Sequence, residues 1–322
     1  MDRNDGQLAH ISAARPLERK AAWELVFKAL PPNLQQAQVD LILRQANAGL
    51  LDLDGLIVAR NGDDMVGAIW VQQLPGSTAA IWFPQRLPGG PPSLARLLLE
   101  ASDAYLEVHN VRLAQCLVTL DSGAEAEILH AAGYERSVDL LYLVSRKDSF
   151  PESPPAKNLQ FERFQRGAER RLKNVIEQTY RETLDCPALA GIRSMEDIVA
   201  GYRATGDTSS THWYFVCDKM EDVGCLLLTN HSKDLHWELI YVGLVPAARG
   251  KGWGLEATRY AQWLTGEAGS DRLVLGVDAA NHPALEMYAS AGFIGWDRRS
   301  VFLKVFSGTT ATRNEIEKLS QH

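Results

Sequence analysis

Three closely spaced glycines, Gly250, Gly252 and Gly254, separate a β-type apolar run from a predicted helix in VGLVPAARGKGWGLE, residues 242–256. In regular structure each glycine costs roughly 0.5–1 kcal/mol relative to alanine, so three together indicate a backbone with a specific task. A helix start leaves about four N–H groups unpaired and carries a partial positive charge, and residues without a Cβ atom let an anion approach them. The stretch therefore predicts a strand–loop–helix unit that binds an anionic ligand.

Two common glycine loops do not match this spacing. A P-loop needs Gly-Lys followed by Ser or Thr, but Gly252 follows Lys251. A dinucleotide fingerprint needs a third glycine where Leu255 stands. The loop also stands too near the end of the sequence, because a Rossmann sheet is built mostly after its first turn. Asp278, at the end of the next predicted strand, would be the ribose ligand in that second, disfavoured interpretation.

The spacing Arg249-x-x-Gly252-x-Gly254 resembles the signature loop of the GNAT superfamily of N-acetyltransferases, which wraps the pyrophosphate of acetyl-CoA. The resemblance continues on both sides of the loop. Upstream, ELIYVGLVP is similar to the family's fourth strand, which splays from its neighbour so that pantetheine can pair with it, and Gly243 suits a bulge there. Downstream, NHPALEMYASAGF matches the family pattern at Asn281, Ala284, Tyr288, Gly292 and Phe293.

The resemblance implies acetyl-CoA as acyl donor and assigns most of the donor site to residues of the loop and its flanks. One backbone N–H of Leu244 or Val245 would polarise the thioester carbonyl, and Asn281 would bond pantetheine or cap the following helix. The predicted donor-binding residues are Leu244, Val245, Arg249, Gly250, Lys251, Gly252, Trp253, Gly254, Asn281 and Ala284.

Two residues carry the proton transfers that the resemblance implies. Tyr288 matches the family's tyrosine that protonates the departing CoA thiolate, and Glu238 lies where one branch of the family keeps a general base. The alternatives are a core aromatic residue for Tyr288 and a solvated strand glutamate for Glu238, with another base or an ordered water deprotonating the amine.

The acceptor pocket is expected in TYRETLDCPALAGIRSMED, residues 179–197, where Tyr180, Asp185, Cys186 and Arg193 could line it. A solvated loop is the alternative interpretation. No histidine stands at a recognisable partner position for Cys186, which argues against a cysteine nucleophile.

A proline-rich stretch, DSFPESPPAK at 148–157, separates two halves with the same predicted order of helices and strands. Their ends can be aligned by laying HAAGYERSVDLLYLV on ASAGFIGWDRRSVFLKV, which sets Gly133 against Gly292. The predicted domains are therefore a GNAT-like domain at 1–150, a linker at 151–157, an acetyl-CoA-binding GNAT domain at 158–306 and a polar tail at 307–322. The expected fold is mixed α/β, with two tandem GNAT-like domains that each contain a mostly antiparallel twisted sheet flanked by helices.

The first half departs from the motifs. In the same alignment Arg249 falls on Gly90, Glu238 on Ala79 and Tyr288 on Leu129, and the loop reads PGGPPSLA, where Pro91 and Pro92 lack the N–H that would bind a phosphate. The first half is expected to be a degenerate copy that does not bind acetyl-CoA productively. One working half in a tandem pair resembles the plan of mycothiol synthase.

The composition of the chain argues against several classes of binding partner. The apolar fraction is 46%, the mean hydropathy is −0.17, and no apolar run approaches the roughly 18 residues of a membrane span. The net charge is −7, and neither half has the basic excess expected for nucleic-acid binding. Four scattered cysteines and eight histidines show no metal-ligand spacing, and the first residues carry no signal-peptide pattern. We therefore expect a cytoplasmic protein that uses no metal and binds neither membrane nor nucleic acid.

Together these features predict an N-acetyltransferase that transfers acetyl from acetyl-CoA to a small-molecule or peptide amine by direct attack in a ternary complex. The alternative is a non-catalytic acyl-CoA sensor or interaction module on the same fold.

Overall fold

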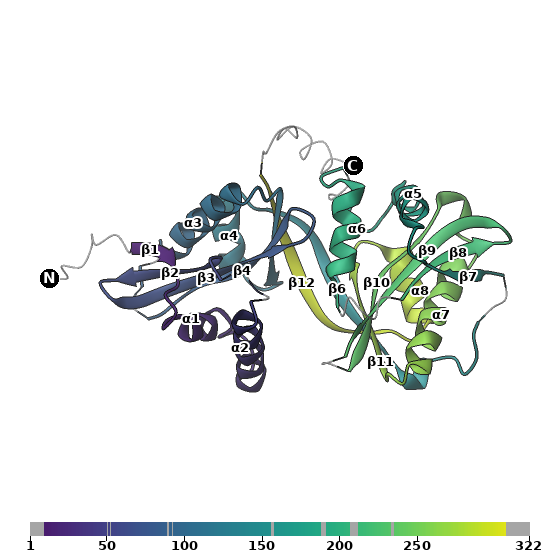
Figure 1. Cartoon of the computed structure of the whole chain (residues 1–322), viewed down its shortest axis with the longest axis horizontal. Helices are drawn as coiled ribbons and strands as arrows, with labels where there is room; N and C mark the ends of the chain where they lie inside the picture. The colour runs from purple at the N-terminus through teal and green to yellow at the C-terminus, as the bar shows by residue number, and fades with distance from the viewer. Residues whose placement is uncertain are drawn as a thin grey trace. The chain divides into compact units, whose positions relative to one another are not determined.

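The computed structural model describes residues 10–49, 51, 53–88, 90–91, 93–155, 158–187, 191–206, 212–232 and 235–306, so the predicted polar tail at 307–322 lies outside the described residues. These residues form two compact units, whose elements are labelled in Figure 1. Among the described residues, the first unit contains those up to Ser137 and those from Ser300 to Phe306, and the second contains those from Val138 to Arg299. This division does not coincide with the predicted boundary at 151–157, because the chain crosses between the units at Ser137/Val138 and at Arg299/Ser300.

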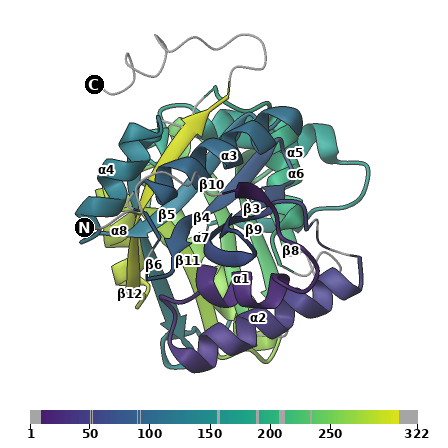
Figure 2. The same cartoon turned by 90° about the vertical axis from the view of Figure 1, so that its left-hand side faces the viewer.

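The first unit is a sheet in the order β1-β2-β3-β4-β5-β12, of which β12 contributes the part from Ser300. Only β4 and β5 run parallel among the pairs with a described register in this unit. Helices α1 and α2 cover one face and α3 and α4 the other (Figures 1 and 2). The elements are β1 (His10–Ala13), α1 (Arg19–Val26), α2 (Pro32–Asn47), β2 (Leu56–Asn61), β3 (Asp64–Leu74), β4 (Thr78–Arg86), α3 (Leu94–Val108), β5 (Leu113–Thr119), α4 (Gly123–Ala131) and β12 (Ile294–Val305).

Alternation along the central strands explains these two layers. In β2, Leu56 and Val58 pack in the cluster under α1 and α2, whereas Ile57 and Ala59 pack in the cluster under α3 and α4. Successive strand side chains point to opposite faces, so a continuous apolar run buries both faces of the sheet. Each fully buried large apolar side chain contributes about 1.5–3 kcal/mol.

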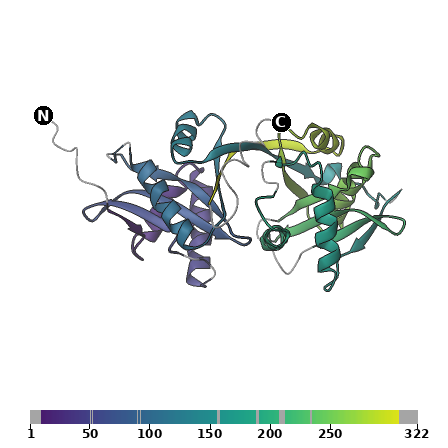
Figure 3. The same ribbon diagram turned by 90° about the horizontal axis from the view of Figure 1, so that it is seen from above.

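The second unit repeats this plan with the order β6-β11-β10-β9-β8-β7, and β10 and β11 form its parallel pair. Helices α5 and α6 pack on one face of its sheet and α7 and α8 on the other, and Figure 3 shows its strands between these helices. The elements are β6 (Glu135–Arg146), β7 (Gln160–Arg163), α5 (Glu169–Tyr180), α6 (Met195–Ala204), β8 (His212–Asp218), β9 (Glu221–His231), β10 (His236–Leu244), α7 (Trp253–Glu267), β11 (Arg272–Asp278) and α8 (His282–Ser290).

The predicted internal repeat is present in the order and length of the elements. The pairs α3/α7, β5/β11, α4/α8 and β6/β12 all begin and end at the spacing that separates Gly133 from Gly292. The strand beside β5, however, is β12, and the strand beside β11 is β6. The two halves of the chain therefore exchange their last strands, and each unit is completed by a strand from the other half of the sequence.

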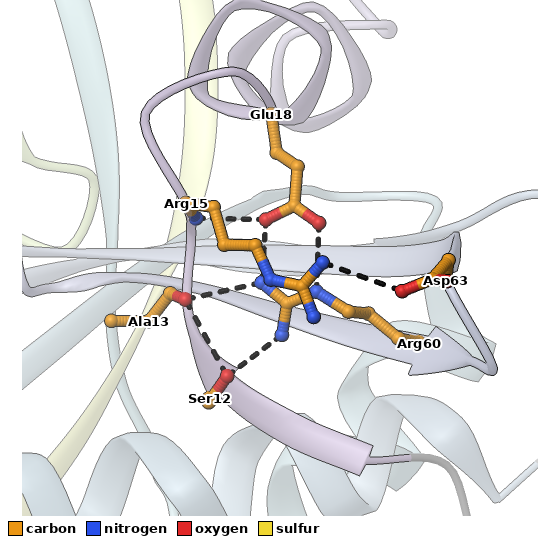
Figure 4. A network of polar contacts seen from close by, with 6 residues as sticks. All are labelled: Ser12, Ala13, Arg15, Glu18, Arg60 and Asp63. Atoms are coloured by element: carbon orange, nitrogen blue, oxygen red, sulfur yellow. Dashed lines mark hydrogen bonds and ion pairs between the residues drawn. The ribbon is translucent and has the colours of Figure 1, made fainter.

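An ion pair between buried Arg60 and partly buried Glu18 joins three elements of the first unit (Figure 4). Arg60 of β2 is 1% exposed and donates to both carboxylate oxygens of Glu18, at 2.7 and 2.5 Å, to Ser12 Oγ at 2.7 Å and to the Ala13 carbonyl at 3.2 Å. The bond from Arg60 lowers the pKa of Glu18 to about 2. The network fixes β1 and the start of α1 against β2.

Within the described part of the chain, none of the helices combines the length and apolar character needed to span a bilayer. Nor do three or more His, Cys, Asp or Glu side chains converge there in an arrangement that could hold a metal ion.

Candidate active site

The two parallel strands of the second unit separate after a short pairing. Strand β10 pairs with β11 only at Trp237 and Glu238, whereas its pairing with β9 continues to Leu244. The register with β9 shifts between Leu239 and Tyr241. The predicted splay is therefore present, but the irregularity lies near residue 240 and not at Gly243. A Cβ atom at Gly243 would instead meet the Tyr241 ring, with its hydroxyl oxygen at 2.5 Å.

A cavity of about 670 Å³ opens at this splay. Its volume lies within the usual range of small-molecule sites, roughly 300–1,000 Å³. Five segments line it: the end of α5 and the loop after it, β10, the glycine loop, the end of β11, and α8. The lining residues include Thr179, Glu182, Asp185, Leu239, Tyr241, Leu244, Arg249, Gly250, Gly252, Gly254, Gly276, Asn281, Ala284, Met287 and Tyr288.

The structure requires glycine at the three positions of the loop for two different reasons. Gly250 and Gly252 have φ of +76° and +77°, and a Cβ atom at either would meet nothing within 4 Å. Gly252 is the N-cap of α7 and offers no side chain to its free amides. Gly254 lies inside α7, where a Cβ atom would come within 2.7 Å of Met287 Sδ. The first two glycines leave an open anion-binding helix start, and the third lets α7 and α8 pack closely.

Two basic residues of the loop have protein partners. Arg249 donates to the carbonyls of Leu244 at 3.1 Å, Thr179 at 3.0 Å, Arg181 at 2.7 Å and Glu182 at 2.8 Å. Its guanidinium therefore binds the C-terminal end of α5, where helix carbonyls lack partners, and these bonds position that segment, whereas the sequence predicted donor binding by Arg249. The exposed Lys251 ammonium lies 4.5 Å from the Trp253 ring centroid and contacts the start of α7.

The α8 residues of the motif meet at the cavity. Asn281 is the N-cap of α8 and accepts a bond from the Ala284 amide at 3.3 Å, which is the capping alternative for this residue. Tyr288 lines the cavity, packs against Phe293, and is buried, which raises the pKa of its phenol. The phenol therefore stays protonated at neutral pH and can donate a proton.

One of the two backbone amides expected to polarise the thioester already has a protein partner. The Val245 amide donates to the Val223 carbonyl at 2.9 Å, so this N–H is occupied and cannot serve as predicted. Leu244 lines the cavity at the end of the splayed strand.

The predicted acceptor residues separate into two groups. Asp185 lines the cavity, and next to it the Cys186 amide donates to Asp278 Oδ2 at 3.2 Å. Tyr180 is not among the residues that line the cavity, and its hydroxyl bonds that of Tyr202 at 2.6 Å. Arg193, also outside the lining, lies beside Gly201 of α6. Asp278, the ribose ligand of the disfavoured dinucleotide interpretation, instead accepts bonds from the amides of Cys186 and Ala280.

Glu238 lies outside this group. Its Oε2 is 2.7 Å from His231 Nε2, and it precedes the splay at the last residue of β10 that pairs with β11. Glu238 is not among the lining residues of the cavity that contains Tyr288. Of the two predicted catalytic residues, Tyr288 therefore lines the cavity and Glu238 does not.

Sequence reasoning missed two lining residues with identifiable roles. Tyr241 forms part of the wall and bonds Thr179 through its hydroxyl at 2.9 Å. Met287 packs against Gly254. Regular alternation along β10 would place Glu238 and Tyr241 on opposite faces of the sheet. The register shift between them adds one residue, which reverses the alternation and puts both on the same face, and the sequence alone does not show this shift.

The first unit differs at the equivalent positions. Strand β4 pairs with β5 over four residues, Thr78 to Ile81, in place of two. Leu129, the counterpart of Tyr288, is fully buried in an apolar cluster with Tyr134 and Phe302. This unit has a longer closed strand pair and an apolar side chain where the second unit has a splay and a phenol.

Comparison with known proteins identifies the class. Residues 176–293, which include all the described residues that line the cavity, match the model of the acetyltransferase (GNAT) family. No curated protein matches the chain significantly in sequence.

Solved structures extend the likeness to nearly the whole chain. A GCN5-related N-acetyltransferase from Sphaerobacter thermophilus is similar with a TM-score of 0.64 at 16% identity, covering 92% of this chain and 95% of that one. A tandem GNAT protein from the clavulanic acid biosynthesis pathway gives 0.55 at 15% identity, covering 94% and 100%. A putative acetyltransferase from Pyrococcus horikoshii gives 0.53 at 10% identity, covering 95% and 92%. At these identities the likeness shows the fold, which is that of two tandem GNAT-like domains.

Proposed function

We propose that the second unit is an N-acetyltransferase that transfers the acetyl group of acetyl-CoA to an amine. The observation that carries this proposal is the meeting of three features in one cavity: an unpaired strand edge, an uncapped helix start with open glycines, and a buried phenol. Acetyl-CoA would supply an activated acyl group, and residues of the second unit would bind its pyrophosphate, its pantetheine and its thioester.

The residues present fit that donor. The pyrophosphate would lie at Gly250 and Gly252, where nothing occupies the space of a missing Cβ atom. The pantetheine would run along the unpaired edge of β10 toward Tyr288, where the peptide groups can bond it as an added strand does. Tyr288 would then donate its proton to the sulfur as the C–S bond breaks.

The transfer is direct in this proposal. Cys186 is an unsuitable acyl carrier, because burial and the neighbouring carboxylates of Asp185 and Asp278 raise the pKa of its thiol. We therefore expect the amine to attack the thioester within a ternary complex, without an acyl-enzyme.

The test follows CoA release from acetyl-CoA against a panel of small amines and lysine-containing peptides. We expect turnover with at least one acceptor, intersecting initial-rate lines, and no acetylated Cys186 in mass spectra. Binding of acetyl-CoA without turnover for any acceptor would favour the non-catalytic acyl-CoA sensor instead.

A further inference from the structure

A carboxylate other than Glu238 occupies the cavity beside the phenol. Asp185 follows α5 and lines the same cavity as Tyr288, and its charge contributes to the raised pKa of that tyrosine. Glu238 has no such place, since its carboxylate pairs with His231 outside the lining. Of these two carboxylates, Asp185 is thus the one positioned to act at the same reacting centre as Tyr288.

The loop that carries Asp185 is fixed from both sides. Asp185 Oδ1 accepts a bond from the Asp278 amide at 3.2 Å, and Asp278 Oδ2 in return accepts one from the Cys186 amide at 3.2 Å. The Asn281 side chain also bonds Asp185. The preceding residues are held by Arg249, which binds the carbonyls of Thr179, Arg181 and Glu182. This double attachment orients the carboxylate without consuming all of its lone pairs.

The charges around the cavity favour a cationic acceptor. Among its described lining residues, the carboxylates are those of Glu182, Asp185 and Glu286, and the cation is Arg249, whose donors are committed to carbonyls. An ammonium that enters here finds carboxylates and no competing free cation among those described residues.

We propose that Asp185 binds the ammonium of the acceptor and is the general base that takes its proton. This inference rests on the proposed acetyl transfer. The ammonium loses its first proton to the Asp185 carboxylate, which later releases it to solvent. The amine nitrogen then bonds the thioester carbon as the C–S bond breaks, Tyr288 protonates the leaving sulfur, and the second proton from nitrogen restores the phenol through solvent.

The titratable groups that face Asp185 are Asp278 from the end of β11, Tyr288 from α8 and Cys186 from its own loop, with Tyr180 and Tyr241 nearby. Desolvation by the surrounding walls of the cavity is the largest influence on the Asp185 carboxyl and raises its pKa, although the residue as a whole is exposed. The rising limb of the rate with pH is therefore expected above the ordinary aspartate value of about 3.9.

The test compares Asp185→Asn with Glu238→Gln on the amine that gives the fastest CoA release. Asparagine keeps an oxygen for the Asp278 amide, so the loop attachment is preserved while the base is removed. We expect Asp185→Asn to lower kcat by a factor on the order of 10²–10⁴ and to abolish the rising limb, with acetyl-CoA affinity unchanged in calorimetry. Asp185→Glu should retain the rising limb of the pH–rate profile at a reduced kcat. Glu238→Gln should retain both the rising limb and the wild-type kcat.

Wild-type turnover and an unchanged pH limb in Asp185→Asn would overturn the proposal for Asp185, as would loss of the limb in Glu238→Gln. If Tyr288→Phe is still impaired in that case, the proposed acetyl transfer stands without Asp185. Absence of transfer to every amine by the wild type would overturn both.

Discussion

The Arg249 guanidinium lies 3.0 Å from the carbonyl of Thr179 in the last turn of α5, so the first residue of the loop motif holds the segment that leads to Asp185. Arg249→Lys keeps the charge but loses the planar fork that reaches several carbonyls. We expect a loss of about 1.5–3 kcal/mol in unfolding free energy and a larger change in kcat than in acetyl-CoA affinity. Urea unfolding and calorimetry at two salt concentrations measure both. A strongly salt-dependent loss of affinity at unchanged stability would restore the phosphate-binding role.

The glycine loop allows a matched pair of variants. Gly252 and Gly269 both have φ of +77°, and a Cβ atom at either meets nothing within 4 Å, but only Gly252 caps the start of α7. Aspartate should cost both positions about 1–2 kcal/mol of backbone strain. Gly252→Asp alone should also reduce acetyl-CoA affinity, by at least tenfold, because it adds a negative charge where the pyrophosphate would lie. Equal affinities in the two variants would refute the assignment of the loop.

Tyr288→Phe should lower kcat by a factor on the order of 10²–10⁴ while acetyl-CoA still binds, because only the proton donor is lost. Burial raises the pKa of this phenol above its ordinary value of about 10. The active, protonated form thus persists to higher pH, and no falling limb from Tyr288 should appear below about pH 10. A pH–rate profile for the wild type, with single-turnover rates for the variant, checks both statements.

Calorimetry of the whole chain should give one acetyl-CoA site. The first unit has Leu129 where the second has Tyr288, and Pro91 contributes no N–H to a phosphate site. Gly252→Asp should then remove all measurable binding. Two equal sites, or binding that survives Gly252→Asp, would show that the first unit also holds the donor.

The ion pair between buried Arg60 and partly buried Glu18 predicts a pH dependence of stability. Glu18 has a pKa of about 2 in the folded state and 4.5 as the reference value, so its contribution is complete above 4.5 and is lost as the pH falls toward 2. Glu18→Gln should cost about 3–5 kcal/mol at pH 6, since Arg60 is left buried without its counter-ion. The same substitution should also reduce the loss of unfolding free energy between pH 4.5 and pH 2, as measured by urea unfolding. Glu24→Gln, which removes the exposed partner of Lys20, should cost less than about 1 kcal/mol.

Local patterns in the sequence sufficed for most elements and for the position of the donor loop. The helix starting after Gly252 and the cap at Asn281 both depend on neighbouring residues, so the motifs located them. The sequence does not predict strand β1, residues His10–Ala13, because four residues without clear alternation give too little signal. Helix α5 ends at Tyr180, and its terminal carbonyls are bound by Arg249, a partner that lies far away in the sequence.

The candidate site was less predictable where contacts are long-range. Residue 254 must be glycine because Met287, on a different helix, packs against it. The position of Asp185 likewise depends on its bond to the distant Asp278. The resemblance placed Glu238 by its distance from the loop, but distance along a strand does not report which side chains face a cavity after a register shift. The sequence also does not predict the strand exchange, because the local patterns of β6 and β12 are the same whether each strand pairs within its own half or with the other half.

The exchanged strands set the order in which the protein can be completed during synthesis. The first unit acquires the strand beside β5 only when Ser300–Val305 has left the ribosome, long after the rest of its sheet has been made. Until then β5 has an open edge, which is a template for pairing with other chains. The second unit, in contrast, already has β6 available before its own helices appear. Maturation of the N-terminal half therefore depends on translation of the C-terminal half, and separate expression of the two halves would leave each with the strand that belongs to the other.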